Sequence, residues 1–211
     1  MAGIQEVYDL VAKGKAKKVA AAVTEALEAG CDPTDILNKG MIAAMDEVGA
    51  KFKNGEIFVP EMLVAAKATK NGVEVLKPHL ASGVAGAAGK VIIGTVSGDL
   101  HDIGKNLVAM MLESSGFEVI DLGVDVPKEK FVEAYEANPD TKLICCSALL
   151  TTTMNAMKET VALLNGSSFR GNIKVMVGGA PISQEFADEI GADAYTEDAA
   201  SCAQRAKELA A

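Results

Sequence analysis

Five short apolar segments alternate with five segments of helical periodicity between residues 90 and 209, and this alternation strongly limits the possible folds. The apolar segments, which are typical of strands, are 90–96, 118–122, 143–147, 174–177 and 192–195; the helical segments are 103–114, 128–137, 154–164, 184–190 and 199–209. Strands and helices in this order build a parallel sheet covered by helices on both faces. We therefore expect an α/β, doubly wound, Rossmann-like (flavodoxin-like) domain with a five-stranded parallel sheet, which binds ligands at the carboxyl ends of its strands.

The first eighty residues follow a different pattern, because their apolar residues recur only every three or four positions. Three breaks that contain glycine divide this part into four helical segments, which predicts a small antiparallel four-helix bundle. The segment 83–89 consists almost entirely of small residues and is typical of a linker. We predict a helical cap domain over 1–82, a linker over 83–89 and the Rossmann-like domain over 90–211.

Composition excludes several classes of protein. The formal net charge of −9 argues against a nucleic-acid-binding surface, and no apolar run reaches the roughly 20 residues that span a bilayer. The N-terminal sequence lacks the basic and apolar regions of an export signal, so we expect a cytoplasmic protein that binds neither membranes nor nucleic acids. The four cysteines have no zinc-ligand spacing and are expected to be free thiols.

The segment GDLHDIG, residues 98–104, connects the first predicted strand to the following helix. It lacks the GxGxxG pattern of a dinucleotide site, and the chain contains no P-loop. A lone His101 could be an ordinary polar residue in a turn, but Asp99 is placed to bond one ring nitrogen and leave the other as a donor. One histidine cannot hold a free metal ion, whereas a macrocyclic metal cofactor needs only one axial donor, as haem does.

Three motifs together resemble a known signature. Asp99-x-His101-x-x-Gly104, Ser147-x-Leu149 and Gly178-Gly179 are similar, in type and separation, to the cobalamin-binding motifs of methionine synthase. They also resemble the small corrinoid proteins of methylamine-, betaine- and methanol-type methyltransferase systems. The predicted helical bundle ahead of the sheet fits the same family, so the resemblance covers nearly the whole chain.

The resemblance implies how the cofactor is bound. Cobalamin or a related corrinoid would bind base-off and His-on, with His101 as the cobalt ligand and with Asp99 and Thr153 completing a catalytic relay. The residues that the resemblance assigns to cofactor binding are Gly98, Asp99, Leu100, His101, Asp102, Ile103, Gly104, Ser147, Leu149, Thr151, Thr153, Gly178 and Gly179, together with Phe58 and Met62 of the cap.

The resemblance also implies a function in one-carbon metabolism, such as methanogenesis or acetogenesis. The chain would be a non-catalytic corrinoid subunit that accepts a methyl group on Co(I) from a methylated substrate, such as a methylamine or betaine, through a substrate:corrinoid methyltransferase. It would deliver that group from methyl-Co(III) to a second methyltransferase with a thiol or tetrahydrofolate acceptor, and a corrinoid reductive activase would be a further partner. The alternatives are a cobalamin-dependent sensor, a cobalamin mutase subunit and a flavodoxin-like domain whose histidine has no function.

Overall fold

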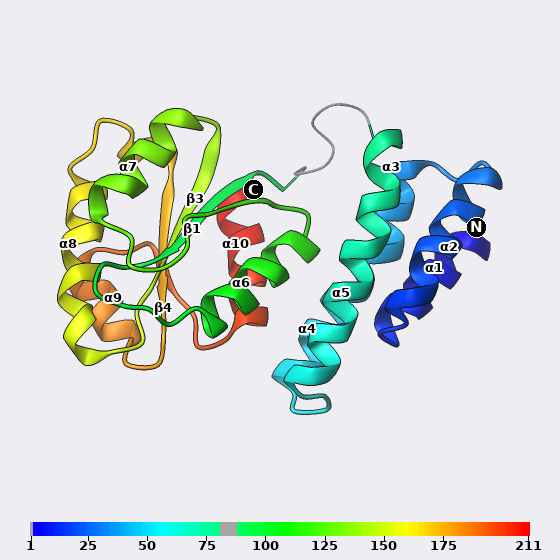
Figure 1. The fold of residues 1–211 in the computed structure, drawn as a ribbon, viewed down its shortest axis with the longest axis horizontal. Coiled ribbons are helices and arrows are strands. Elements are labelled where there is room, and N and C mark those ends of the chain that lie inside the picture. The colour runs from blue at the N-terminus through cyan, green and yellow to red at the C-terminus, as the bar shows by residue number, and fades with distance from the viewer. Residues whose placement is uncertain (1, 81–87) are drawn as a thin grey trace. The chain divides into compact units, whose positions relative to one another are not determined.

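The computed structural model describes residues 2–80 and 88–211, which fall into two compact units, one helical and one built on a sheet (Figure 1). Most of the predicted linker, 83–89, lies outside the described residues. The two units are described separately below.

The helical unit is built from α1 (Ala2–Ala12), α2 (Ala16–Glu28), α3 (Pro33–Asp35), η1 (Ile36–Ile42), α4 (Ala43–Lys53), α5 (Val59–Leu76) and η2 (Lys77–His79). The segment η1 is a π-helix that runs directly between α3 and α4. It contains Gly40, where an added Cβ would come within 3.3 Å of Val7 on α1. The helical periodicity of the sequence did not predict this change of helix type.

Small residues let the helices of this unit approach closely. A Cβ added to Gly72 on α5 would come within 2.5 Å of the Met41 sulfur and 2.9 Å of Val19 on α2. Val19 and Met41 of this contact are fully buried, and so is Met62 earlier on α5. Burial of such apolar side chains is the main stabilising contribution in a bundle of short helices.

The sheet unit contains five parallel strands in the order β2-β1-β3-β4-β5. The strands are β1 (Lys90–Thr95), β2 (Glu118–Asp121), β3 (Thr141–Ser147), β4 (Lys174–Gly178) and β5 (Ala194–Tyr195). The helices are α6 (Ile103–Ser114), α7 (Lys128–Ala137), α8 (Met154–Asn165), α9 (Gln184–Ile190) and α10 (Ala199–Ala210), with short 3-10 turns η3 (Thr151–Thr153) and η4 (Arg170–Asn172). The predicted doubly wound fold behind a helical region is confirmed.

Helices cover both faces of this sheet: α7, α8 and α9 lie on one face, and α6 and α10 on the other (Figure 1). The central strands are therefore buried on both sides, as the apolar runs IIG of β1 and LICC of β3 require. The chain leaves β1 toward β2 on one side and returns to β3 on the other. The carboxyl ends of β1 and β3 thus form the topological switch point, where sheets of this order bind their ligands.

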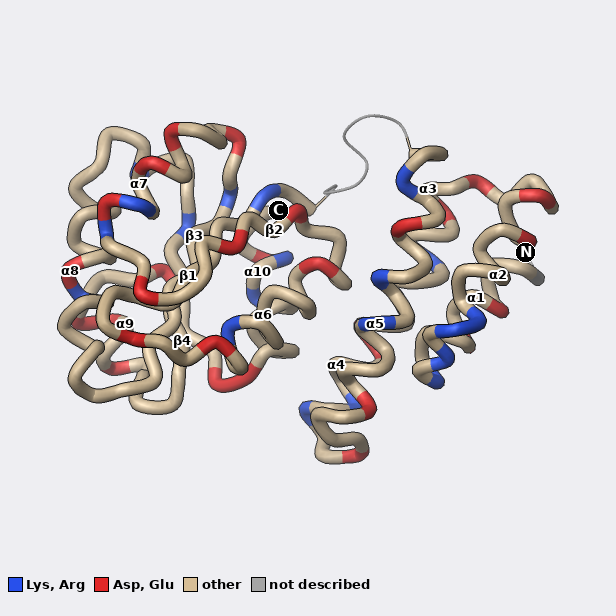
Figure 2. The backbone as a smooth tube through the Cα atoms, in the orientation of Figure 1, with Lys and Arg blue, Asp and Glu red and all other residues tan. Residues whose placement is uncertain are grey.

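Basic and acidic residues are interspersed along the helices (Figure 2). Several form ion pairs one helical turn apart, such as Lys39 with Asp35 at 2.9 Å and Lys130 with Glu133 at 2.6 Å. Exposed pairs of this kind stabilise a helix only slightly. Within the described residues, no helix is both long enough and apolar enough to cross a membrane.

Candidate functional site

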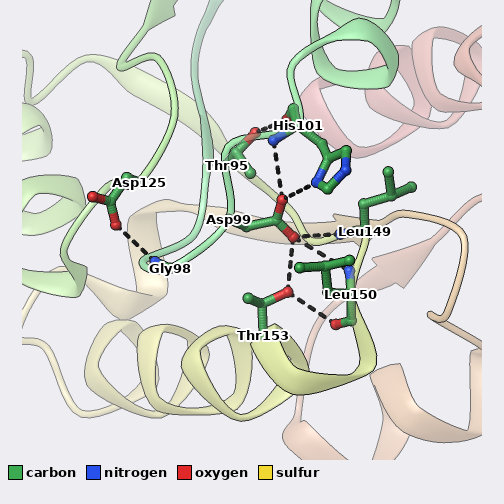
Figure 3. A network of polar contacts seen from close by, with 8 residues as sticks. All are labelled: Thr95, Gly98, Asp99, His101, Asp125, Leu149, Leu150 and Thr153. Carbon is green, nitrogen blue, oxygen red and sulfur yellow. Dashed lines mark hydrogen bonds and ion pairs between the residues drawn. The ribbon is translucent and has the colours of Figure 1, made fainter.

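Two loops meet at the switch point and share a buried carboxylate (Figure 3). The first loop follows β1 and carries Asp99 and His101; the second follows β3 and carries Leu149, Leu150 and Thr153. Asp99 has no exposed surface and bonds to residues of both loops. It therefore joins segments that are fifty residues apart in the sequence.

Five donors converge on the Asp99 carboxylate. Its Oδ2 accepts hydrogen bonds from the backbone N–H of Leu149 at 2.7 Å and of Leu150 at 3.4 Å, and from the Thr153 hydroxyl at 2.8 Å. Its Oδ1 lies 2.8 Å from His101 Nδ1 and accepts from the His101 backbone N–H at 3.1 Å. Burial alone would raise the pKa of Asp99, but the bonds from Leu149, Thr153 and His101 together outweigh it and hold that pKa well below its usual value.

The ionised carboxylate fixes the state of the His101 ring. Because an ionised carboxylate can only accept, the proton between the two side chains belongs to Nδ1, and in the neutral ring the free lone pair is then on Nε2. Among the described residues, none forms a hydrogen bond with Nε2, and about half of the His101 side chain (49%) is exposed. The Thr95 hydroxyl also donates to the His101 carbonyl oxygen at 2.9 Å, which holds the backbone of this residue. The ring therefore presents one oriented nitrogen donor to the surface.

The segments that carry His101 and Leu149 also carry large apolar side chains that are exposed. Leu100 is 72% exposed on the first loop, Ile103 is 85% exposed at the start of α6, and Leu149 and Leu150 are about 40% exposed on the second loop. Side chains of this size are normally buried, and a cluster of exposed ones marks a binding surface. A single nitrogen donor within an apolar rim fits a broad, largely apolar ligand whose metal needs one axial ligand.

The glycines of the three motifs differ in whether the protein's own fold requires a glycine at that position. Gly98 has φ +80° and Gly179 has φ +134°, a region that favours glycine, and a Cβ on Gly179 would lie 1.8 Å from the Ala148 carbonyl oxygen. A Cβ on Gly104, by contrast, would meet no atom within 4 Å. The protein's own packing does not require glycine at position 104, so the open space there is available to a ligand.

The remaining predicted residues lie at several places. Ser147 ends β3 and pairs in register with Gly178 at the end of β4, so both lie at the same edge of the sheet as Asp99. Asp102 and Thr151 are exposed on the two loops, and the Asp102 carboxylate accepts a hydrogen bond from Asn106 at 3.0 Å. The two cap candidates belong to the helical unit: Phe58 is 68% exposed, whereas Met62 is fully buried in that unit's core.

Sequence reasoning missed two residues that hold the first loop. Thr95 bonds the His101 carbonyl oxygen, and Asp125 accepts a hydrogen bond from the Gly98 backbone N–H at 2.7 Å. Asp125 belongs to the sequence GVDVP after β2, which carries only an ordinary turn signal. A third interaction, between the buried Lys105 ammonium and Asp121 at 2.5 Å, anchors the start of α6.

The donor set in the described part of the chain suits a cofactor that supplies most of its own metal ligands. Within residues 2–80 and 88–211, no group of three or more His, Cys, Asp or Glu side chains could hold a metal ion. His101 is nevertheless oriented as a metal ligand is, with its second nitrogen bonded to a carboxylate. The exposed apolar rim and the open space at Gly104 agree with a macrocyclic group of this kind.

Comparisons with known proteins agree with this geometry. Two family models, each described as a B12 binding domain, match residues 89–203 and residues 4–77. The chain is 46% identical to dimethylamine corrinoid protein 1 of Methanosarcina acetivorans over 210 residues, which are 99% of this chain and 97% of that protein.

Two solved structures are also similar. A cobalamin-binding protein from Desulfitobacterium hafniense DCB-2 has a TM-score of 0.82 at 28% identity, covering 98% of each chain. The methanol:cobalamin methyltransferase complex MtaBC from Methanosarcina barkeri contains a chain with a TM-score of 0.86 at 31% identity, covering 99% of this chain and 80% of that one. The similarity therefore extends over both units of the chain.

Proposed function

This chain belongs to the corrinoid proteins with B12 binding domains, and from that membership we propose that it carries methyl groups from dimethylamine or a closely related methylamine. The predicted family and the predicted corrinoid cofactor are confirmed, and so is a methyl-carrier role in a methyltransferase system. The choice of a methylamine rests on the 43–46% identity to several dimethylamine and trimethylamine corrinoid proteins, against 31% to the chain of the methanol complex.

The observation that supports the site most strongly is the single oriented imidazole within an apolar rim. We propose that His101 Nε2 would hold the cobalt of the corrinoid, as the base-off and His-on prediction requires. When bound, the corrinoid supplies a cobalt centre that can take up and release a methyl group. Leu100, Ile103 and Leu149 would cover apolar parts of the macrocycle and exclude water from it.

The residues around His101 control its proton. The Asp99 carboxylate accepts a hydrogen bond from the His101 Nδ1–H, which leaves Nε2 free to ligate. The Thr153 hydroxyl has one proton and lies near two acceptors, Asp99 Oδ2 at 2.8 Å and the Leu150 carbonyl oxygen at 2.9 Å. The charged acceptor is the stronger of the two, so the hydroxyl donates to Asp99 and stabilises its ionised form.

The open space and the glycines would take the rest of the cofactor. Gly104 leaves room beside the first loop, and Ser147 with Gly178 and Gly179 lines the carboxyl edge of β3 and β4. We propose that the lower nucleotide of the corrinoid lies along this edge. Phe58 is a candidate contact from the helical unit because it is a large, exposed apolar side chain.

The partners that fit this role are enzymes. We propose a methylamine:corrinoid methyltransferase as the donor enzyme, a second methyltransferase with a thiol or tetrahydrofolate acceptor, and a reductive activase that restores the reduced cofactor. A role in a methyltransferase system agrees with the corrinoid relatives and with the methanol methyltransferase complex.

A substrate panel tests the proposal. The protein is loaded with cobalamin, reduced, and mixed with dimethylamine, trimethylamine, monomethylamine, glycine betaine or methanol, each with the methyltransferase specific for it. The absorption spectrum of the corrinoid reports methylation, and we expect the fastest change with dimethylamine or another of the methylamines. Faster methylation from methanol or betaine would make the proposed substrate wrong. Failure to bind cobalamin, under conditions where a known dimethylamine corrinoid protein binds it, would refute the carrier role itself.

A further inference from the structure

The segment that follows β2 lies beside the end of β1 and the first loop of the site, and backbone hydrogen bonds join the two. The Thr95 backbone N–H donates to the Gly123 carbonyl oxygen at 3.0 Å, and the Val126 N–H donates to the Thr95 carbonyl oxygen at 2.9 Å. Val126 also forms an isolated parallel bridge with Val96. The pairing of β1 with the chain that follows β2 therefore extends beyond both strands and brings residues 123–126 beside the Gly98 turn.

Asp125 bonds this turn at two points. Its carboxylate Oδ1 accepts a hydrogen bond from the Gly98 N–H at 2.7 Å (Figure 3). Its own backbone N–H donates to the Asp99 carbonyl oxygen at 2.9 Å. The Ser97 hydroxyl lies farther from the same carboxylate oxygen, at 3.5 Å. One residue thus holds the backbone on both sides of the step from Gly98 to Asp99.

The backbone of Asp125 supports a specific role for its side chain. Asp125 has φ +52°, and among the described residues it is the only one other than glycine with a positive φ. This left-handed conformation costs free energy for a residue with a Cβ, although aspartate tolerates it better than most. Glycine would relieve the cost, as it does at Gly123 nearby with φ +84°, but glycine has no carboxylate to bond the turn.

We propose that Asp125 is a positioning residue for the corrinoid site: its carboxylate fixes the Gly98 turn and thereby sets the position of Asp99 and of the His101 ring. Without the carboxylate, the Gly98 N–H loses its acceptor. Two backbone bonds to the turn remain: one from the Asp99 N–H to the Val96 carbonyl oxygen at 3.2 Å, and one from the Asp125 N–H to the Asp99 carbonyl oxygen at 2.9 Å. The bonds from the Asp99 side chain to the second loop would remain, but the backbone that carries Asp99 and His101 would be less restricted. The functional meaning of this placement rests on the proposed role of His101 as the cobalt ligand.

The first test uses the protein without cofactor, so its result does not depend on that role. In Asp125→Gly the backbone strain is relieved while the acceptor is lost, so the melting temperature should stay within a few degrees of the original. Nitrogen NMR of His101 should show a lower share of the ring with its proton on Nδ1, and the Gly98 amide proton should move upfield and exchange faster with solvent. A role in stability alone would leave the His101 ring signals unchanged.

The second test uses the cobalamin-loaded protein. We expect Asp125→Gly to bind cobalamin about tenfold more weakly, at the lower end of the loss caused by removing a residue that orients a metal ligand. The EPR spectrum of the Co(II) form should also show a smaller share with splitting from a histidine nitrogen. If the wild-type protein itself does not bind cobalamin, the proposed function fails, while the cofactor-free measurements still decide the role of Asp125.

Two further variants serve as controls. Ser97→Ala removes only the long contact to Asp125, so its NMR signals and cobalamin affinity should match those of the wild type. Asp125→Asn keeps an oxygen acceptor and tolerates the left-handed backbone, so it should restore part of the loss seen in Asp125→Gly. If Asp125→Gly does not fold, Asp125→Asn carries the test, because a neutral acceptor should still weaken the Gly98 bond. Unchanged Gly98 and His101 signals in the folded Asp125 variants would overturn the proposal.

Discussion

Asp99→Asn is the most informative single change, because it keeps the shape of the side chain but replaces one acceptor oxygen with an NH2 group, which donates. The Asp99 carboxylate accepts from Leu149, Leu150 and Thr153 at Oδ2 and from the backbone and ring of His101 at Oδ1. An asparagine has one acceptor oxygen and one NH2 group. If the oxygen faces the second loop, the NH2 group faces His101, whose backbone N–H loses its acceptor.

The NH2 group of the new asparagine would also change the preferred tautomer of the His101 ring. An NH2 group next to Nδ1 favours the tautomer in which Nδ1 accepts and Nε2 carries the proton, and a protonated Nε2 cannot ligate a metal. The loss expected for a disturbed partner of a metal ligand is about 10–100-fold in affinity. We expect Asp99→Asn to bind cobalamin more weakly by about that factor and to lose splitting from a histidine nitrogen in the EPR spectrum of the Co(II) form.

The cost to stability follows from the contacts. Hydrogen bonds to a charged group contribute about 1.5–3 kcal/mol and neutral ones about 0.5–1.5 kcal/mol, so the three donors on the second loop together lose roughly 3 kcal/mol. Removal of a buried charge offsets part of this loss, since Asp99 has no exposed surface. We therefore expect the free energy of unfolding of the cofactor-free variant to fall by about 2–3 kcal/mol, measured by urea titration at pH 7.

The pH dependence gives an independent check. The pKa of Asp99 is lowered in the folded protein, so the stability that its ionised form contributes is present above the unfolded-state pKa of about 3.9 and is lost as the pH falls through the folded-state pKa. The difference in unfolding free energy between wild type and Asp99→Asn should be constant above about pH 5 and shrink at lower pH. Equal cobalamin affinity, equal EPR spectra and a difference independent of pH would refute the assignment of Asp99.

Three further changes test other parts of the molecule. His101→Gly should retain the fold, because the ring is half exposed, and its Co(II) EPR spectrum should show no splitting from a histidine nitrogen; persistent splitting from a protein histidine would make the ligand assignment wrong. Gly179→Ala should lower the unfolding free energy by about 2 kcal/mol or more, because residue 179 has φ +134° and the new Cβ would clash with the Ala148 carbonyl oxygen. Gly104→Ala should instead keep the stability of the protein and weaken cobalamin binding. Tyr8→Phe tests the helical unit: the hydrogen bond to Glu47 raises the pKa of Tyr8 to about 12, so the wild type should lose stability between pH 10 and 12 in a titration where the variant does not.

The order of strands and helices could be predicted from the sequence because the physical cause is local. Central parallel strands are buried on both faces, so β1 and β3 are continuous apolar runs, and the helices between them keep one apolar face. The contact between Asp99 and the His101 ring is also local, since a spacing of two residues across a tight turn allows it. Such features need no knowledge of the remainder of the fold.

Other features depend on contacts between distant segments and left little trace in the sequence. The π-helix η1 accompanies the close approach of Gly40 to Val7, which apolar periodicity cannot show. The bond from Gly98 to Asp125 requires the exact pairing of Val96 with Val126. A one-residue change in that pairing would turn the Asp125 carboxylate away from the turn, so no short pattern could have identified it.

The motif glycines show how fold and ligand requirements can be separated within one signature. Gly179 is required by the protein alone, because a Cβ there would overlap the Ala148 carbonyl oxygen. Gly104 is not required by the protein, because the space around it is open in the described structure. A sequence signature treats the two positions alike, since both are simply glycine. If Gly104→Ala keeps the stability of the cofactor-free protein but weakens cobalamin binding, then the glycine at position 104 is needed by the cofactor, whereas the glycine at position 179 is already needed to form the edge of the sheet on which the cofactor lies.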